Sequence, residues 1–349
     1  MNDAGEFGFD ISGIKAYSGY YLDPGRLRES ASGGAASAIA EGFLGAGGVV
    51  FGVTYGPDFR SAEYCCAERP EELERMKGSK YIASRKEVCV DGAYRSVYRA
   101  IQDKLENGYR VLFIGLGCDV GAVCRYLEVR GVGTENLYTM DLICHGPTSP
   151  EVAAQYLDAL EKKRRSRVVD FTVRYKKTGW VPPYLRAVFE SGEVYERPFY
   201  ETDYGRAFSR FPRAGCFHCG FRGAHHASDL TVGDYWGVPE KPPEYNKDGV
   251  SILFLNRPGK GETLLELLDR ETFHLREADV VRALKGNASY HQRRKKPKGY
   301  DQFAKNFAER GLHDAVARST GIRARAKSAL KSVLPQGVIK ALKKARGRS

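Results

Sequence analysis

The stretch that decides the fold is residues 110–147, which read RVLFIGLGCDVGAVCRYLEVRGVGTENLYTMDLICHGP. Its first apolar run, Arg110 to Gly115, predicts a buried strand, and a Gly-containing turn leads from it into a helix that ends near Arg130. A second apolar run, Leu137 to Ile143, predicts another buried strand, which stops at Cys144. Buried strands that alternate with helices are typical of a sheet with parallel strands.

The sequence on both sides continues this alternation. Before the central stretch, the patterns predict strands at 14–21 and 49–54 and helices at 35–44, 71–77 and 94–107, with the serines before residue 35 able to cap that helix. After it, they predict a helix at 149–165, strands at 168–176 and 184–190 with a hairpin turn to Val194, a strand at 251–256, and mostly helix beyond. We therefore expect an α/β fold, a mixed sheet with flanking helices and a helical C-terminal extension.

Composition excludes several classes of protein. The chain has 349 residues, of which 42% are hydrophobic and 28% charged, so it has enough apolar residues for a large core. No apolar run approaches the roughly 20 residues that cross a bilayer, and the first residues have no apolar signal region. We expect a cytoplasmic protein. Eight cysteines are too few for a disulfide scaffold of this length, which favours metal or cluster ligation for some of them.

The net charge of +12 is concentrated at one end. Residues 321–349 contain nine Lys or Arg and no acid, so the rest of the chain is nearly neutral. Two stretches of this basic tail, 327–334 and 338–344, alternate apolar and basic residues at helical spacing and predict two short amphipathic helices. The tail is interpreted as a solvated end or as a contact for an anionic inner-membrane surface or an acidic partner; we expect no nucleic-acid partner.

Four cysteines are candidate metal ligands. Cys216 and Cys219 form a C-x-x-C pair in a Gly- and Phe-rich loop, a spacing that suits half of a zinc site, an iron–sulfur cluster or a redox pair. Cys118 and Cys144 each follow a buried strand, and the carboxyl ends of neighbouring parallel strands meet at one edge. These four thiols are therefore predicted to surround one site. The other four, of which Cys124 is the weakest exclusion, are expected to be small buried hydrophobic residues: Cys65, Cys66, Cys89 and Cys124.

A dinucleotide-binding interpretation of the central stretch is weaker. The strand, the Gly-rich turn, the helix and Asp141 near the end of the next strand imitate such a unit. The fingerprint requires a third glycine where this chain has Val120.

The ordered motifs resemble those of the coenzyme F420 hydrogenase/dehydrogenase beta-subunit family. The resemblance extends from Ile14 to Val238, about two-thirds of the chain. The segments that carry it are SASGG at 30–34, KGSKY at 77–81, DLICHGP at 141–147, and Cys216 to Cys219 followed by SDLTVGDYWG at 228–237. It implies an α/β flavoprotein that holds FAD beside a [4Fe–4S] cluster and relays electrons between a deazaflavin or similar carrier and a partner.

Two departures from the family pattern concern the site. Gly117 and Asp119 stand where the family commonly has Pro and Gln around the cysteine, which affects flavin or substrate contacts more than the thiolate. No cysteine precedes Cys65, so the ferredoxin-like domain of many relatives would have to be a separate protein. Bacterial relatives are often associated with surface-polysaccharide synthesis, which leaves the carrier open.

The resembling segments predict the cofactor contacts. Hydroxyls and amides at the start of a helix suit a pyrophosphate, and a lysine after a Gly–Ser turn would place positive charge near a reduced flavin. The predicted cofactor-binding residues are Ser30, Ser32, Gly33, Gly34, Gly78, Ser79, Lys80 and Tyr81. His145, next to Cys144, is expected to take a hydrogen-bonded supporting role, with a proton relay as the alternative. Asp229 and Asp234 are expected to fix the cluster loop or to contact a ligand, around a strand that Trp236 packs down. No role is assigned to His225 or His226.

These inferences give a division of the chain and a function. The expected segments are 9–92 and 93–256 for the two parts of the family region, with the cysteines in the second, 257–320 for the helical extension and 321–349 for the basic tail. The expected function is an oxidoreductase in which FAD and a [4Fe–4S] cluster connect a two-electron carrier, F420 or another, to a one-electron partner, in either direction. The alternative is a zinc-binding, non-redox accessory protein of polysaccharide assembly.

Overall fold

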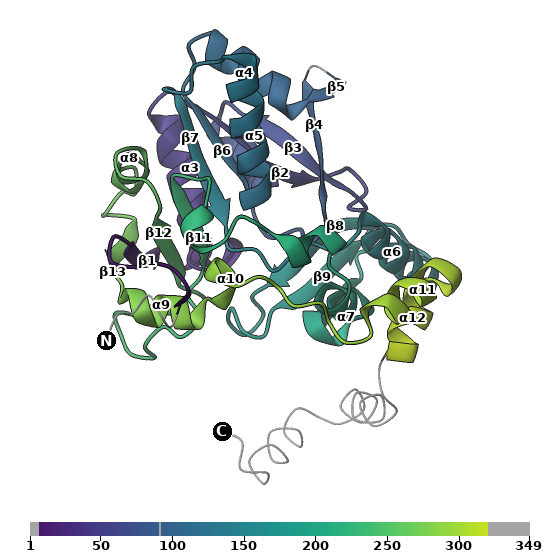
Figure 1. Cartoon of the computed structure of the whole chain (residues 1–349). Helices are drawn as coiled ribbons and strands as arrows, with labels where there is room; N and C mark the ends of the chain where they lie inside the picture. The colour runs from purple at the N-terminus through teal and green to yellow at the C-terminus, as the bar shows by residue number, and fades with distance from the viewer. Residues whose placement is uncertain (1–6, 91, 320–349) are drawn as a thin grey trace.

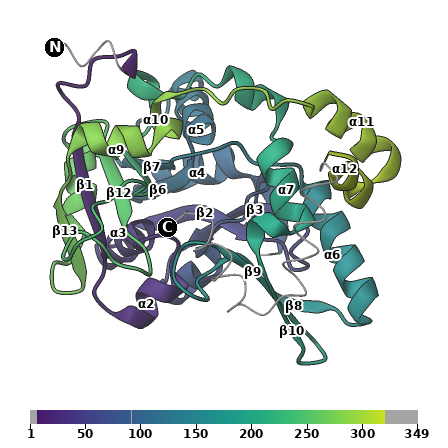
Figure 2. The same ribbon diagram turned by 90° about the horizontal axis from the view of Figure 1, so that it is seen from below.

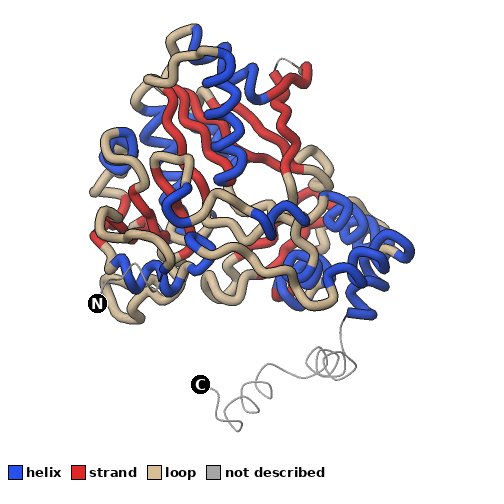
Figure 3. The backbone as a smooth tube through the Cα atoms, in the orientation of Figure 1, coloured by secondary structure: helices blue, strands red, loops and turns tan. Residues whose placement is uncertain are grey.

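The computed structural model describes residues 7–90 and 92–319, which form a ten-stranded sheet, a three-stranded sheet and the helices around them (Figures 1 and 3). The strands are β1 (Lys15–Tyr21), β2 (Val49–Tyr55), β3 (Ala62–Ala67), β4 (Ser84–Val90), β5 (Ala93–Ser96), β6 (Val111–Leu116), β7 (Leu137–Leu142), β8 (Val168–Tyr175), β9 (Tyr184–Phe189), β10 (Val194–Pro198), β11 (Leu230–Asp234), β12 (Ser251–Leu255) and β13 (Phe273–Glu277). The α-helices are α2 (Pro24–Glu29), α3 (Ala35–Gly45), α4 (Val97–Glu106), α5 (Gly117–Arg130), α6 (Pro150–Arg164), α7 (Asp203–Arg210), α8 (Lys260–Glu266), α9 (Val280–Gly286), α10 (Ala288–His291), α11 (Tyr300–Arg310) and α12 (Leu312–Ser319). Short 3₁₀ helices are η1 (Pro70–Met76), η2 (Phe199–Glu201), η3 (Ala214–His218) and η4 (Gly223–His225).

Four parallel strands form the centre of the large sheet, whose order is β13-β1-β12-β11-β7-β6-β2-β3-β4-β5. β2, β6, β7 and β11 run in the same direction, with Val50 opposite Leu112 and Gly115 opposite Asp141. Antiparallel pairs extend the sheet on both sides. On one side β12 pairs with β11 and β1, and β1 pairs with β13; on the other side β2 pairs with β3. Because the central strands share a direction, their carboxyl ends lie on one edge, where ligands bind in α/β sheets.

Alternating side chains place helices on both faces of the sheet. In β2, Val49 and Phe51 pack with helices α4 and α5, whereas Val50 packs with α3 and α8. β6 follows the same rule, because Val111 packs with α4 and α5 whereas Leu112 packs with α3 and α8. Parallel strands covered on both faces read as continuous apolar runs, which is why the sequence pattern located them.

The small sheet, β10-β9-β8, forms a second layer with its own core. Helices α6, α7, α11 and α12 pack around it, and their buried residues form one cluster with those of β8 and β9. In Figure 2 this layer lies on the side of the molecule opposite β1 and β13. The carboxyl edge of the large sheet therefore faces a second packed layer, and the loops between the two layers bound the site.

The predicted α/β fold class, with a mixed sheet and flanking helices, is confirmed. Several local expectations are wrong. The segment after residue 256 is mostly helical, as expected, but it also contains the unpredicted strand β13, which pairs with β1. Ala93–Ser96 is strand β5, so the helix predicted from residue 94 begins at Val97. Cys89 is exposed, since its strand pairs with the short edge strand β5.

Two further predictions concern the segment boundaries and the basic tail. Strands from 9–92, 93–256 and 257–320 pair within one sheet, so the large sheet crosses the predicted boundaries. The basic tail, 321–349, lies outside the described residues, and its two helices and membrane contact stay predictions. Within 7–90 and 92–319, no helix has the length and apolar character needed to cross a membrane.

Candidate functional site

Two cavities lie side by side at the carboxyl edge of the large sheet. The larger one, called the large cavity, has a volume of about 290 Å³, and the smaller one, called the cysteine cavity, about 50 Å³. The same residues after β6 and β7 line both: Leu116, Leu142, Cys144, Gly146 and Pro147. The turn after β7 is thus the wall between the two cavities.

All four predicted cysteine ligands line the cysteine cavity. Cys118 lies in the first turn of α5, Cys144 follows β7, and Cys216 and Cys219 lie in and just after η3. Cys124 lies further along α5 and packs beside the core between that helix and the sheet. The parallel strand ends explain why residues 118 and 144 meet, whereas the position of the 216–219 loop depends on the second layer.

Burial raises the pKa of three of the four cavity thiols, Cys118, Cys144 and Cys216. It raises the pKa of Cys144 to about 12, although the Gly146 amide donates a hydrogen bond of 3.2 Å to its Sγ. Burial, with Asp119 nearby, raises the pKa of Cys118 to about 11, and burial also raises the pKa of Cys216. A bound metal group would displace these protons. No three His, Cys, Asp or Glu side chains in the described ranges are grouped closely enough to hold a metal ion, so the ligand assignments stay predictions.

Arg222 leaves an unused donor at the cysteine cavity. The residue is 9% exposed, and its Nη2 donates a 2.7 Å hydrogen bond to the Cys144 carbonyl. Its Nε is buried and has no acceptor among the described residues. A buried N–H without a partner is costly, and here it belongs to a cation beside four thiols. The cavity is therefore suited to an anionic occupant that accepts this hydrogen bond.

A buried Asp–His network supports the wall of the cysteine cavity. Asp141, on β7, lies 2.9 Å from His226 Nδ1, and Thr231 on β11 donates to the other carboxylate oxygen. His226 Nε2 lies 3.1 Å from the Tyr290 carbonyl, and the two rings stack with centroids 4.3 Å apart. This network joins two strands, the 221–226 loop and α10. Sequence reasoning assigned His226 nothing, although an Asp in an apolar strand signals a buried partner.

The two departures from the family pattern have local explanations. A Cβ at Gly117 would lie 2.9 Å from Asp141 Oδ2 and 3.1 Å from the Phe221 side chain, so neither proline nor alanine fits there without a shift. Asp119 is buried and accepts a hydrogen bond of 2.9 Å from Tyr64, and it forms an ion pair of 2.8 Å with Lys86. The chain thus has its own acid–lysine pair at the border of the large cavity.

Six of the eight predicted cofactor-binding residues line the large cavity: Ser32, Gly34, Gly78, Ser79, Lys80 and Tyr81. The other two lie behind this lining. Ser30 donates to the Arg26 carbonyl, and the Gly33 amide donates to Ser251 Oγ over 3.0 Å.

The N-terminus of α3 opens toward the large cavity. Its N-cap is Gly34, at φ 88°, where a Cβ would lie 2.3 Å from the Tyr21 ring. The expected serine cap is wrong, because the Ser32 hydroxyl donates instead to the Val250 carbonyl. The amides of Ala36 and Ser37 find no acceptor in the described part of the chain. Uncapped amides at a helix N-terminus suit a phosphate group.

Lys80 organises the loop after η1. Its buried ammonium donates three hydrogen bonds of 2.7–2.9 Å, to the carbonyls of Met76, Lys77 and Gly78. Burial lowers the pKa of Lys80 to about 8. Since all three donors are used inside the chain, Lys80 shapes this wall of the cavity instead of offering a free charge to it.

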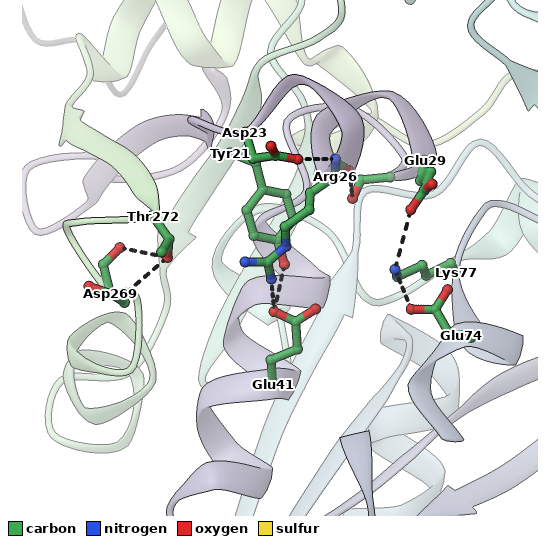
Figure 4. A network of polar contacts seen from close by, with 10 residues as sticks. Tyr21, Asp23, Arg26, Glu29, Glu41, Glu74, Lys77, Asp269 and Thr272 are labelled. Carbon is green, nitrogen blue, oxygen red and sulfur yellow. Dashed lines mark hydrogen bonds and ion pairs between the residues drawn. The ribbon is translucent and has the colours of Figure 1, made fainter. Parts of the chain in front are cut away.

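Lys176 does the same for the loop between α2 and α3. It reaches from the end of β8 and donates to the carbonyls of Leu27 and Ser32, both over 2.6 Å. Burial, with Arg174 nearby, lowers the pKa of Lys176 to about 7. Figure 4 shows a surface contact between the two loops, where Lys77 lies between Glu74 at 2.5 Å and Glu29 at 4.0 Å.

A bidentate ion pair forms the side of the large cavity that faces the small sheet. Arg174 on β8 contacts both carboxylate oxygens of Asp234, at 2.6 and 2.9 Å. Burial alone would raise the pKa of Asp234, but the guanidinium outweighs it and the pKa is lowered. Arg174 also donates to the Tyr81 hydroxyl, and the Tyr81 ring stacks on Phe208 at 4.3 Å. Asp234 was expected at the site; Arg174 was missed.

Trp236 reaches the large cavity from the turn after β11. It is 37% exposed and stacks on Trp180 with centroids 4.9 Å apart and planes 12° apart. The expectation that it packs β11 down is therefore wrong, because its partner belongs to the small-sheet layer. Asp229 instead fixes the start of β11, accepting from the Thr139 amide and hydroxyl at 2.7 Å.

His145 lies in the wall between the cavities. Its Nδ1 is 3.2 Å from the Ser289 hydroxyl, and its carbonyl accepts from Arg294. Burial lowers the pKa of His145, with Arg294 and Arg222 acting in the same direction. The expected hydrogen-bonded position next to Cys144 is therefore present, and its partner is a serine from α10.

Comparison with known proteins agrees with this geometry. Two family models, which describe the N-terminal and the C-terminal parts of the coenzyme F420 hydrogenase/dehydrogenase beta subunit, match residues 16–86 and 108–280. The fold is similar to a chain of the F420-reducing [NiFe] hydrogenase complex from Methanosarcina barkeri, with a TM-score of 0.52 and 17% identity over 78% of this chain and 89% of that one. Among curated proteins, none matches the sequence.

Proposed function

Since the chain belongs to the coenzyme F420 hydrogenase/dehydrogenase beta-subunit family, we propose that it is an iron–sulfur flavoprotein oxidoreductase. It connects a two-electron carrier, an F420-like deazaflavin or another, to a one-electron partner. One observation carries the proposal: the turn from Cys144 to Pro147 lines the large cavity on one side and, on the other, the cysteine cavity, whose lining includes four thiols.

The large cavity fits FAD by its donors and its lining. Its volume, about 290 Å³, is close to the lower end of cofactor pockets at ~300 Å³. The free amides of Ala36 and Ser37 would hold the pyrophosphate, and the apolar walls at Ile82, Ile114 and Ile143 would accept the ring. FAD, when bound, supplies the exchange of a hydride for single electrons.

The cysteine cavity offers the thiol ligands that a [4Fe–4S] cluster takes. Four cysteines line it, from the first turn of α5, the turn after β7 and the loop around η3. A cluster, when bound, supplies one-electron exchange through its thiolate ligands Cys118, Cys144, Cys216 and Cys219. Arg222 would donate its free Nε–H to this anionic group and offset part of its charge.

The chain's own residues keep the two groups adjacent and separate. The turn after β7 would lie between a flavin in the large cavity and a cluster in the cysteine cavity. Arg222 fixes this turn at the Cys144 carbonyl, and Arg294 fixes it at the His145 carbonyl. The Arg174–Asp234 pair and Trp236, which stacks on Trp180, line the large cavity.

The test is the visible spectrum and metal content of protein purified without oxygen. We expect flavin bands above a broad cluster shoulder, with about four irons per chain. A colourless protein with stoichiometric zinc would contradict the proposal and favour the non-redox accessory protein of polysaccharide assembly. A flavin spectrum without iron would contradict the cluster alone.

A further inference from the structure

A basic segment crosses the surface beside the cysteine cavity. Residues 287–300, from the end of α9 to the start of α11, contain five Lys or Arg and no acid. We call the part from Arg293 to Lys298 the basic strap. In Figures 1 and 2 the chain runs here from α10 across the molecule to α11, past the loops that follow α7.

Hydrogen bonds and ring contacts fix both ends of the basic strap around the cysteines. Ser289, just before it, lines the cysteine cavity and contacts His145. Arg294 donates to the carbonyls of His145 and Ser209, at 2.6 and 2.5 Å. Beyond the strap, the Tyr300 ring lies against Phe217, between the two cysteines of the C-x-x-C pair, with centroids 5.0 Å apart. The strap is therefore part of the folded rim of the cavity.

Most of the strap's charge has no acidic partner among the described residues. Arg293, Lys295 and Lys298 are exposed, and none of them has an acidic partner among the described residues. Lys296 pairs only with Asp301, whose side chain is 80% exposed, so this contact is weak. The loop from Phe211 to Ala227 carries Arg213 and Arg222 and likewise no acid. The surface around the four thiols is thus positive.

We propose that the basic strap is the docking surface for an acidic protein that carries one electron. This inference rests on the proposed function, because it requires a redox group in the cysteine cavity. Charge complementarity selects the partner: a negative surface approaching the strap comes to the rim of the cysteine cavity, where Arg294 holds the His145 carbonyl and Tyr300 packs on Phe217. Each docking event transfers one electron, so one centre is oxidised, the other is reduced, and no proton or leaving group moves.

The experiment compares two one-electron donors of opposite charge. The full-length holoprotein, with its iron content measured first, is mixed under anaerobic conditions with a reduced acidic [2Fe–2S] ferredoxin or with reduced methyl viologen, a small cation. The strap variant is Arg293→Glu/Lys295→Glu/Lys298→Glu. A matched control, Lys162→Glu/Lys163→Glu/Arg167→Glu, makes the same change in charge at the end of α6, where these side chains are also exposed.

At low salt, the second-order rate constant with ferredoxin should fall at least about tenfold in the strap variant and less than about twofold in the control. The wild-type rate should fall as salt rises, and the viologen rate should not fall in either variant. Equal ferredoxin rates in both variants, or no reaction of ferredoxin with the iron-loaded wild type, would overturn the proposal. A lower rate constant with both ferredoxin and viologen in the strap variant would overturn the proposal too, since the strap would then only shape the cavity. Absence of iron would instead remove the proposed function itself.

Discussion

The chain itself satisfies the buried cations around the large cavity, whereas the cysteine cavity keeps a buried donor of Arg222 without an acceptor among the described residues. Around the large cavity, Lys80 and Lys176 donate to five backbone carbonyls and Arg174 pairs with Asp234. Around the cysteine cavity, the thiols of Cys118, Cys144 and Cys216 have raised pKa values and the Arg222 Nε lacks an acceptor among the described residues. The first region is a preformed receptor, and the second requires its occupant to satisfy buried groups.

The largest expected effect separates Cys144, which lines both cavities, from the other three predicted cysteine ligands. Replacing Cys144, Cys118, Cys216 or Cys219 with Ser should lower iron content at least about tenfold, because a hydroxyl is a poor ligand for iron in a cluster. Only Cys144→Ser should also change the flavin spectrum, since Cys144 lines both cavities. Iron and flavin are measured on each variant, with Cys66→Ser as the control. Full iron in Cys118→Ser would transfer that ligand position to Cys124.

A second substitution tests whether the large cavity is preformed. Lys176→Met leaves the carbonyls of Leu27 and Ser32 unpaired, so we expect a loss of about 1–3 kcal/mol in unfolding free energy and weaker flavin binding. Urea unfolding and flavin release report these effects, while iron content should stay unchanged. Lys163→Met, at an exposed position, is the control. Loss of iron in Lys176→Met would contradict the view that the two cavities are stabilised independently.

The buried lysines also predict a pH dependence of stability. Because the folded pKa of Lys80 is about 8 and the unfolded value is about 10.4, the folded chain binds fewer protons between these limits. The unfolding free energy of the wild type should therefore rise with pH in this window, relative to Lys80→Met, by on the order of 1 kcal/mol from pH 8 to pH 9.5. Urea unfolding of both proteins at these two pH values measures the difference. If the unfolding free energies of both proteins change equally with pH, the pH dependence belongs to other groups.

The smallest expected effect concerns the charge of Arg222 at the cysteine cavity. Arg222→Gln removes a positive charge and the free Nε–H, so the reduced, more negative cluster should become less stable. We expect the cluster midpoint potential to fall by a few tens of millivolts, where about 59 mV corresponds to a tenfold change in equilibrium. The flavin potential should not move, and Arg222→Lys should restore part of the shift. Redox titration followed by electron paramagnetic resonance measures the cluster alone.

The sequence patterns predicted the features of the fold that depend on neighbouring residues. The apolar runs located the central strands, and the common direction of β6 and β7 predicted that Cys118 and Cys144 meet. β13 was missed because its sequence, FHLRE, mixes polar and apolar residues at an edge. The buried cations could not be predicted, since Lys176 contacts carbonyls 149 and 144 positions away and His226 meets Asp141 across 85 positions. Such contacts follow from the packing of two layers, which no short pattern encodes.

The position of β1 has a consequence for biosynthesis. This strand, near the start of the chain, lies between β12 and β13, which come from its last third. The Ser251 hydroxyl at the start of β12 accepts from the amides of Gly33 and Ala35, at the entrance of α3. An emerging chain folds from its N-terminus, yet this part of the large cavity cannot form until residue 277 has left the ribosome. Insertion of the proposed cofactor would therefore be a late step, after translation of nearly the whole chain.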